Sequence, residues 1–472
     1  MTIKGANLKG RLSAILKLTL QAIKGSEEDY TKLSINKAIF LLAVPMVVEM
    51  LMEGLFAIAD IFFVAGISEE AVATVGLTES VMTLVYSIGI GLSMATTAMV
   101  ARRIGEKKPG EASLAASQSI LLAAGLSFFI AIAGIFNARE ILELMGGSPE
   151  LVASGYRYTA WMLGTNLIIM LLFLLNAIFR GAGDASLAMR SLIVANGLNI
   201  ILDPILIYGL GPVPAMGLEG AAIATVIGRG TAVLYQSWSL LAGSAIVRLL
   251  AKNFVPVGAI LWRLVKISAG GMGQFIIGSA SWVFLIKIMS DFGTDALAGY
   301  TIAIRVIIFS ILPSWGLANA AATLTGQNLG AGHPERAEAS VWKCALYNMI
   351  FLGGLSVFFA FAADEVIMLF SNEPGVIAVG ADTLRYVSLG YVFFAYGMVM
   401  LQAFNGAGDT LTPTLINLMG YWLIQIPLAW ILAKHLDWQS NGVIWAIVIA
   451  EVILAVTSIF IFRTGRWKNK QV

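Results

Sequence analysis

The sequence is short of the residues that build disulfides, metal centres and catalytic sites. Its 472 residues include one cysteine, Cys344, and two histidines, His333 and His435. One cysteine cannot form an internal disulfide, and so few sulfur and nitrogen ligands leave no cluster for a zinc site. No nucleophile stands with a base in a recognisable catalytic pattern. We therefore expect a protein that is not an enzyme and that holds no cofactor.

Charged residues are also scarce, at 12% of the chain, whereas hydrophobic residues make up 58%. Soluble domains carry about 25% charged residues, so this composition argues against a soluble protein. It is typical of an all-α polytopic membrane protein whose length is mostly spent crossing the bilayer. The formal net charge of +2 gives no reason to expect a nucleic-acid partner.

Twelve apolar stretches after residue 35 reach the ~20 residues that a membrane-spanning helix needs. Their approximate limits are 36–66, 70–102, 113–136, 151–180, 185–210, 217–245, 258–290, 296–327, 337–362, 378–405, 411–434 and 440–463. We expect six spans in a lobe over 36–245 and six in a lobe over 258–463. A cytoplasmic linker at 246–257 joins the lobes, and a basic tail occupies 464–472.

Residues 1–35 form the only long polar segment, and no signal peptide is evident in them. Two interpretations remain open. The stretch from Leu12 to Ile23 could form an amphipathic helix on the membrane surface, or the segment could be a partly disordered basic tail. In either case Lys and Arg cluster at both termini, in the linker and in the 102–108 loop. The excess of positive charge on one side predicts that both termini are cytoplasmic.

An internal repeat appears at a shift of 225 residues. Phe179 to Asp184, FRGAGD, aligns with Phe404 to Asp409, FNGAGD, and two further matches occur at the same shift. Six spans per copy is an even number, so the two copies share one orientation in the membrane. This predicts two six-helix lobes around a central cavity, as in an alternating-access transporter.

The most informative stretch is Pro45 to Asp60, PMVVEMLMEGLFAIAD, an apolar run that carries three acids. At about 100° per residue, Glu53 lies about 40° and Asp60 about 20° around the helix from Glu49. All three acids therefore share one side of a spanning helix. A carboxylate there costs roughly 2.5–3.5 kcal/mol, so such acids normally face a partner or a water-filled cavity. We interpret the stripe as part of a cation path.

The spans at 185–210 and 217–245 add further polar groups. Asn199 and Asp203 are four residues apart and share a helix face, and Thr225 offers a hydroxyl in the next span. Oxygen atoms of Asp60, Asn199, Asp203 and Thr225 would suit Na⁺, whereas crowded carboxylates would equally suit H⁺. The sequence leaves both ions open. Asn176 either joins this network or bonds a neighbouring helix.

The remaining charges in apolar runs are expected to lie near helix ends and to snorkel toward water. They are Arg157, Glu219, Arg229, Lys287, Asp291, Arg305, Arg385 and Glu451. Lys287 and Asp291 are predicted to pair at a spacing of four residues, and Arg305 is the best candidate among them to line the cavity. Under the shift of 225 residues Asp60 becomes Leu285, so the acids of the first stripe belong to the first lobe only.

These motifs together resemble the multidrug and toxic compound extrusion (MATE) family. The resemblance rests on PMVVEMLMEGLFAIADIFFVAG, ARRIGEKKPGEA, FRGAGD and NGLNIILDP in this order, and it is greatest to the DinF-like prokaryotic subgroup. It implies a twelve-helix exporter in the prokaryotic inner membrane that expels amphipathic, often cationic compounds in exchange for inward H⁺ or Na⁺. It also implies that Asp60, Asn176, Asn199, Asp203 and Thr225 hold the cation and that Pro45 is a hinge. Glu53 departs from the glutamine expected there, and Gln274 replaces an acid that other subgroups place in the second lobe.

Three other functions fit the sequence less well than a drug antiporter. A lipid or lipid-linked oligosaccharide flippase should show Lys and Arg within its spans to meet phosphates, whereas the first lobe shows acids. A membrane enzyme would need a nucleophile, a base or a set of metal ligands, which the sequence does not show. A channel has a fixed pore, whereas two repeated lobes are better suited to a rocking motion. The expected partners are small amphipathic substrates, the coupling ion and membrane lipids, and two packed lobes suffice for a monomer.

Overall fold

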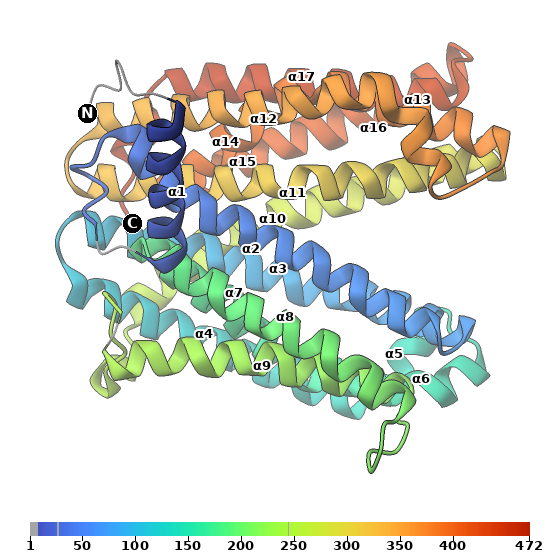
Figure 1. Ribbon diagram of the computed structural model, residues 1–472, viewed down its shortest axis with the longest axis horizontal. Helices are drawn as coiled ribbons and strands as arrows, with labels where there is room; N and C mark the ends of the chain where they lie inside the picture. Colours follow the sequence, from blue (N-terminus) through green and yellow to red (C-terminus); the bar gives the residue numbers. More distant parts are fainter. Residues whose placement is uncertain (1–7, 26–27, 244) are drawn as a thin grey trace.

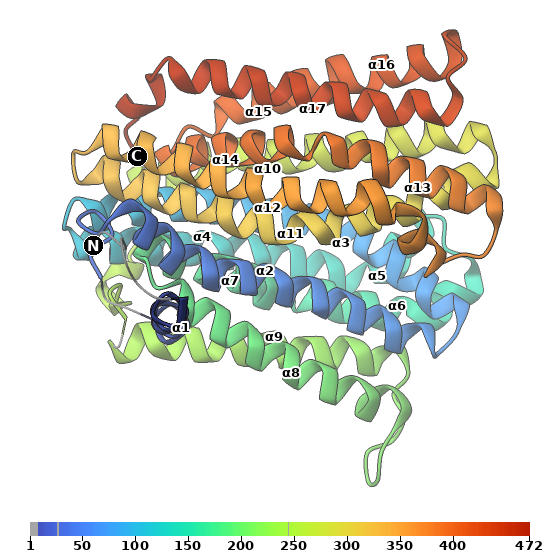
Figure 2. The same ribbon diagram turned by 45° about the horizontal axis from the view of Figure 1, so that its top comes forward.

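The computed structural model describes residues 8–25, 28–243 and 245–472. These residues form a bundle of long helices, and the only β-type pairing among them is an isolated bridge between Leu210 and Val213. Figures 1 and 2 show the long helices running side by side along the longest axis of the molecule. The expected all-α class is confirmed.

The first lobe contains α2 to α9. Their bounds are α2 Ile35–Ala65, α3 Glu69–Gly105, α4 Pro109–Phe136, α5 Ala138–Leu144, α6 Pro149–Gly164, α7 Asn166–Ala182, α8 Ala185–Tyr208 and α9 Leu218–Ala242. Within the lobe, α8 packs against both α9 and α2, and α3 packs against α7. This packing brings α2, α8 and α9 together, and these are the helices that carry the predicted cation ligands.

The second lobe contains α10 to α17. Their bounds are α10 Gly258–Met289, α11 Thr294–Gly330, α12 Pro334–Met368, α13 Pro374–Leu389, α14 Tyr391–Ala407, α15 Leu411–Asn417, α16 Ile426–Trp430 and α17 Gln439–Arg463. Between and after α15 and α16, Leu418–Gln425 and Ile431–His435 have the wider turns of a π-helix. Pro427 contributes to this irregularity because it has no N–H to donate to the preceding turn.

The number of spans agrees with the expected twelve. Nine helices in the described ranges are long and apolar enough to cross a membrane, with Leu411–His435 taken as one, and two bent pairs raise this number to eleven. The twelfth pass is α9, which has 25 residues. The predicted limits lie close to these helices, for example 258–290 against Gly258–Met289.

Two expected spans are bent rather than straight. The chain turns by 40° between α6 and α7 and by 57° between α13 and α14. At the first bend the Asn166 side chain donates to the carbonyl oxygens of Leu163 and Ser127, at 2.6 and 3.1 Å. A side-chain amide that satisfies backbone carbonyls in this way stabilises a break in the helical hydrogen-bond ladder.

The two lobes meet chiefly through α2 and α3 of the first and α10 and α11 of the second. Contact is closest at the end of the molecule that carries the chain termini, where a Cβ on Gly105 would lie 2.0 Å from the carbonyl oxygen of Gln327. In Figure 1 the two lobes are close together at this end and diverge toward the opposite end. Contact between the lobes continues beyond this end into α2, where a Cβ on Gly54 would lie 2.8 Å from Leu312 of α11.

The terminal segments also cross between the lobes at this end. Arg102 of α3 donates to the carbonyl oxygen of Lys470 at 2.5 Å, and the Lys470 ammonium pairs with Asp409 of the second lobe at 3.2 Å. At the other terminus, Asp29 pairs with Lys107 of the first lobe at 2.9 Å. Arg336 of the second lobe donates to the Tyr30 carbonyl oxygen at 3.0 Å. We call these contacts the terminal bridge.

Residues Leu8–Lys24 form a helix, α1, which runs across the bundle at the terminus end (Figures 1 and 2). Ala22 is buried against the bundle, whereas Ile15, Leu16 and Leu20 are exposed. The described part of this segment is therefore a helix, as the first of the two interpretations expected. Residues 1–7 lie outside the described ranges.

Three of the charges expected to snorkel or pair behave differently. Asp291 forms its ion pair with Lys434, at 2.5 Å, and no pair with Lys287 is present. Arg229 and Glu451 lie inside their lobes rather than at helix ends. Arg229 stands near the middle of α9, Leu218–Ala242, and Glu451 stands at the middle of α17, Gln439–Arg463. Arg305 is exposed.

Candidate cation site in the first lobe

The centre of the site is a carboxylate and an amide on one face of α8. The Asn199 side chain donates to Asp203 Oδ1 at 3.2 Å, and the two residues are 1% and 0% exposed. The second carboxylate oxygen of Asp203 and the amide oxygen of Asn199 are buried without a hydrogen-bond partner among the described residues. Buried polar atoms are nearly always paired. These two buried oxygens are therefore available to accept a cation or a proton.

Small residues bring α9 close to these two groups. A Cβ on Gly228 would lie 2.8 Å from the carbonyl oxygen of Ala195 and 3.1 Å from Asn199 Cβ. A Cβ on Gly220 would lie 2.4 Å from the Leu206 carbonyl oxygen. Only glycine permits this approach of one backbone to another. The close packing of α9 presents buried Thr225 toward the carboxylates.

Asp60 reaches the same place from α2. Its carboxylate lies near the Thr225 side chain and interacts electrostatically with Asp203. The structure thus brings together Asp60, Asn199, Asp203 and Thr225, the four residues for which the sequence suggested Na⁺ ligation. They come from three helices, which is why no single sequence motif contains them.

The sequence missed two members of this surrounding. Glu79 of α3 accepts hydrogen bonds from the Tyr86 hydroxyl at 3.2 and 3.1 Å and lies near Asp60. Arg229 of α9 lies 3.9 Å from Glu53 and stacks over the Phe56 ring at 4.3 Å from its centroid. A signal was present for Arg229, because it stands four residues after Thr225 and so shares its helix face. Glu79 stands alone in its span and gave no comparable signal.

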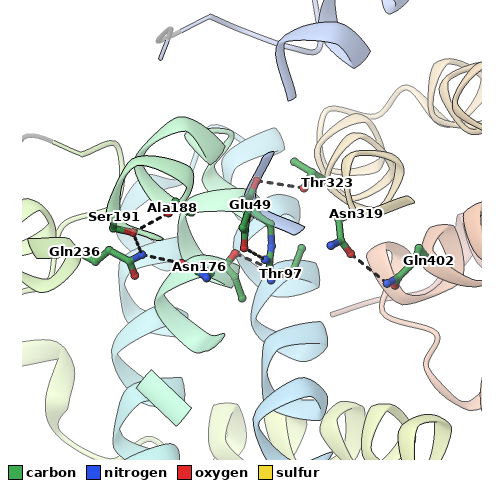
Figure 3. Close-up of polar contacts among 11 residues, drawn as sticks. Glu49, Thr97, Asn176, Ala188, Ser191, Gln236, Asn319, Thr323 and Gln402 are labelled. Atoms are coloured by element: carbon green, nitrogen blue, oxygen red, sulfur yellow. Dashed lines mark hydrogen bonds and ion pairs between the residues drawn. The ribbon is translucent and has the colours of Figure 1, made fainter. Parts of the chain in front are cut away.

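Glu49 is held apart from this cluster by its own counter-ion. It is 1% exposed and forms an ion pair with Arg180 of α7 at 2.5 Å, while its second carboxylate oxygen has no partner among the described residues. The Arg180 carbonyl oxygen accepts a hydrogen bond from Thr323 of the second lobe at 3.2 Å. Figure 3 shows Glu49 at this junction between the lobes.

Asn176 belongs to a separate network. Its side-chain oxygen accepts a hydrogen bond from Gln236 of α9 at 2.7 Å, and Gln236 also donates to the Ser191 hydroxyl at 2.5 Å (Figure 3). Asn176 therefore bonds a neighbouring helix, α9, which is the second of its two expected roles. No hydrogen bond from Asn176 to the acids is present among the described residues.

Pro45 is buried inside α2, and the helix continues through it without a break from Ile35 to Ala65. Proline removes one backbone hydrogen bond and weakens the helix locally. The role of Pro45 as a hinge stays a prediction.

The three comparisons with known proteins agree with one another. The family model MatE matches residues 45–205 and 271–431, one stretch of equal length in each lobe. The chain is 25% identical over 443 residues to a probable multidrug resistance protein NorM of Thermotoga maritima, which covers 93% of this chain and 94% of that protein. It is 24% identical over 407 residues to an FAD transporter of Shewanella oneidensis, covering 86% and 89%.

A solved structure with a similar fold is the outward-facing conformation of a multidrug resistance MATE family transporter of the MOP superfamily. The TM-score is 0.86 at 26% identity, and the match covers 94% of this chain and 97% of the other. The helices and their arrangement are therefore shared over nearly the whole length.

Proposed function

Because the chain belongs to the MatE family and is a membrane transporter of that family, we propose that it is a secondary active multidrug efflux antiporter. It exports amphipathic, often cationic organic compounds and takes up H⁺ or Na⁺ in exchange. It works as a monomer in the inner membrane, with both termini in the cytoplasm. No enzymatic step is involved.

The observation that carries this proposal is the pair of orphaned oxygens on Asn199 and Asp203. They stand near Asp60, in a lobe where one arginine, Arg229, is shared by Glu53, Glu79 and Asp60. Carboxylate and amide oxygens suit a hard cation, and crowded buried carboxylates suit a proton. Both ions fit the donor set. The names of relatives such as the Thermotoga protein support drugs as the cargo.

The proposed mechanism is that the substrate and the coupling cation are not bound at the same time. A cation that binds at Asp60 and Asp203 neutralises them, lets α2 repack near Pro45 and weakens the binding of a cationic substrate. The two lobes then rock so that the cavity between them opens at the terminus end. Each ligand shifts the conformational equilibrium only by its differential affinity for the two states, and that difference suffices to couple the two fluxes.

A lipid flippase is the second candidate. Relatives of this chain include an FAD transporter, so phosphate-bearing cargo occurs among similar proteins. Phosphate recognition needs unpaired arginine or lysine, whereas Arg180 and Arg229 are both paired with acids here. The charge of the first lobe favours the drug antiporter.

The test is efflux of a fluorescent lipophilic cation from proteoliposomes, with a pH gradient and a Na⁺ gradient imposed separately. We expect one gradient to drive export, and Asp60→Asn to reduce export to the level of protein-free liposomes. Asn176→Ala is the matched control, because it removes a polar group outside the cluster. Export that ignores both gradients would favour the flippase.

A further inference from the structure

The second lobe contains a buried acid of its own. Glu451 stands at the centre of α17 and is 7% exposed. Helix centres in membrane proteins lie at the depth where an ionised carboxylate is most costly, and acids found there normally serve transport. The sequence placed Glu451 within the expected span 440–463, with apolar residues on both sides.

Its partner is a tyrosine on the neighbouring helical segment. The Tyr421 hydroxyl donates to Glu451 Oε1 at 3.2 Å, and no arginine, lysine or histidine forms an ion pair with Glu451 among the described residues. Tyr421 lies in the π-helical turn Leu418–Gln425. Such wide turns are rare and occur frequently at functional sites.

The charged and titratable groups on the elements packed around Glu451 are engaged elsewhere or lie near helix ends. Asp382 pairs with Arg385, Lys434 pairs with Asp291, and Tyr391 bonds Ser310. The remaining ones are Arg263, Lys266, Lys287, Tyr386, Tyr396 and His435. None of them makes a hydrogen bond or an ion pair with Glu451, so its charge is uncompensated.

A seam of unpaired oxygens extends from Glu451 along the same contact. Asn417 Oδ1, Gln425 Oε1 and Ser458 Oγ are buried without a partner among the described residues. Asn417 and Gln425 stand four residues before and after Tyr421 and share its side, and Ser458 stands two turns after Glu451 on α17. Gly420 packs on Leu454 and Gly442 on Ala433. This antiparallel register places Asn417 opposite Ser458.

Glu451 does not repeat a ligand position of the first lobe. Under the shift of 225 residues it falls on Val226, one residue after Thr225 and therefore about 100° around the helix from it. The seam differs from the first site in one respect. Among the described residues its only carboxylate is that of Glu451, whereas the first site has two, those of Asp60 and Asp203. A single buried carboxylate with a hydroxyl donor and no counter-ion suits a proton.

We propose that Glu451, with Tyr421 as its hydrogen-bond donor, is a second proton-binding site of the transport cycle, located in the second lobe. The carboxylate takes up one H⁺ from water in one conformation of the cycle and returns it to water in the other. No electrons are transferred. The inference rests on the proposed antiport, which supplies the conformational cycle.

The experiment measures proton release from purified protein in weak buffer when ethidium is added, together with the carboxylic-acid band in infrared difference spectra between acid and alkaline pH. We expect Glu451→Gln to bind ethidium, to lose one released H⁺ per protein and to lose one carboxylic-acid component. Glu365→Gln, an exposed acid of the same lobe, is the control and should behave as wild type. Tyr421→Phe should move the midpoint of proton release to higher pH.

The outcomes separate this inference from the proposed function. If wild-type export is driven by a gradient and Glu451→Gln releases as many protons as wild type, Glu451 is a permanently neutral structural residue. If Glu451→Gln does not fold, an unchanged midpoint in Tyr421→Phe overturns the inference in the same way. Export that ignores both gradients overturns the antiport, and the second proton site with it.

Discussion

A carboxylate inside a membrane helix needs a counter-ion, a bound cation or a proton. Arginines are too few to serve every acid inside the first lobe. The acids are Glu49, Glu53, Asp60, Glu79 and Asp203, and the arginines are Arg180 and Arg229. Arg180 is used by Glu49, which leaves Arg229 to the other four. The surplus of negative charge lies at Asp60 and Asp203, and there the coupling ion is expected to bind.

The ion pair of Glu49 and Arg180 allows a direct test of which acids are structural. Arg180→Met should destabilise the protein by about 3–5 kcal/mol, because it leaves a buried carboxylate without its partner. The double variant Glu49→Met with Arg180→Met should recover most of that loss. Thermal unfolding of the detergent-purified variants, followed by size-exclusion chromatography, measures both. A double variant as unstable as Arg180→Met alone would show that Glu49 is not paired mainly with Arg180.

Asp203 is expected to behave in the opposite way. Asp203→Asn removes a charge that has no counter-ion, so we expect stability to be unchanged or raised while coupling is lost. Ion-driven efflux and thermal unfolding, measured on the same preparation, separate the two effects. Loss of stability by more than about 2 kcal/mol, the scale of a lost charged hydrogen bond, would assign Asp203 a structural role instead.

Residue-level sequence reasoning succeeded where one helix carried the pattern. Asn199 and Asp203 stand four residues apart, so their hydrogen bond followed from helix geometry. It was less informative where the partner came from another helix. The pairing of Asp291 with Lys434 rather than Lys287, and of Asn176 with Gln236, depends on which helices are neighbours. Hydropathy does not determine that.

At the scale of single helices, the site depends on how closely α9 approaches α8. Gly228→Ala places a methyl group 2.8 Å from the Ala195 carbonyl oxygen, which should cost about 1–3 kcal/mol through overpacking. It should also push Thr225 away from Asp60 and reduce ion-driven efflux at least tenfold. Transport assays at matched expression measure this.

Gly230→Ala is the control on the same helix. A Cβ there meets only the end of Ile168, at 3.7 Å, which is an ordinary contact. Gly230→Ala should keep efflux within about twofold of wild type. It should change the free energy of unfolding by no more than about 0.5 kcal/mol. Equal losses in the two variants would show that α9 tolerates no added methyl group anywhere, and the argument from close approach at Asn199 would fail.

The helices themselves were largely predictable, because apolar length determines where a span lies. What the sequence could not give was their shape. The bend at Thr165 depends on Asn166 reaching Ser127 of another helix. The π-helical turns near Tyr421 depend on packing as well as on Pro427. Glu451 was expected near a helix end, although the expected span 440–463 is centred on it, and the structure buries it at the middle of α17.

At the scale of the whole molecule, the lobes are held closed at the terminus end by the terminal bridge. Arg102 binds the Lys470 carbonyl, and Arg336 binds the Tyr30 carbonyl. Replacing both arginines with alanine should shift the population toward the state that is open at this end. Spin labels at Gly110→Cys and Glu335→Cys, in a Cys344→Ser background, report the distance between lobes. We expect a longer distance to become populated, and an unchanged distribution would show that the bridge is passive.

The pH dependence of the bridge has a definite sign. Burial opposes ionisation of Asp29, but hydrogen bonds from Thr31 and Lys107 outweigh it and lower the pKa of the carboxyl to about 2, from an ordinary value of 3.8. The contribution of the ionised form is therefore complete above the ordinary value and is lost only as the pH falls through about 2. The contacts of Asp29 in the bridge should therefore stay intact from pH 8 to pH 5. A change in the distance between the two labels within that range would report protonation of other groups, such as Asp60 and Asp203.

The central claim is that substrate and coupling ion exclude each other through Asp60 and Asp203. Fluorescence titration of the purified protein with ethidium tests it most directly, at increasing Na⁺ at fixed pH and at decreasing pH without Na⁺. We predict that one ion weakens ethidium binding about 5- to 150-fold, the range of typical coupling between sites. Ethidium should weaken the binding of that ion by the same factor, and Asp203→Asn should abolish both effects. Ethidium affinity independent of both ions, or coupling that survives Asp203→Asn, would contradict the account.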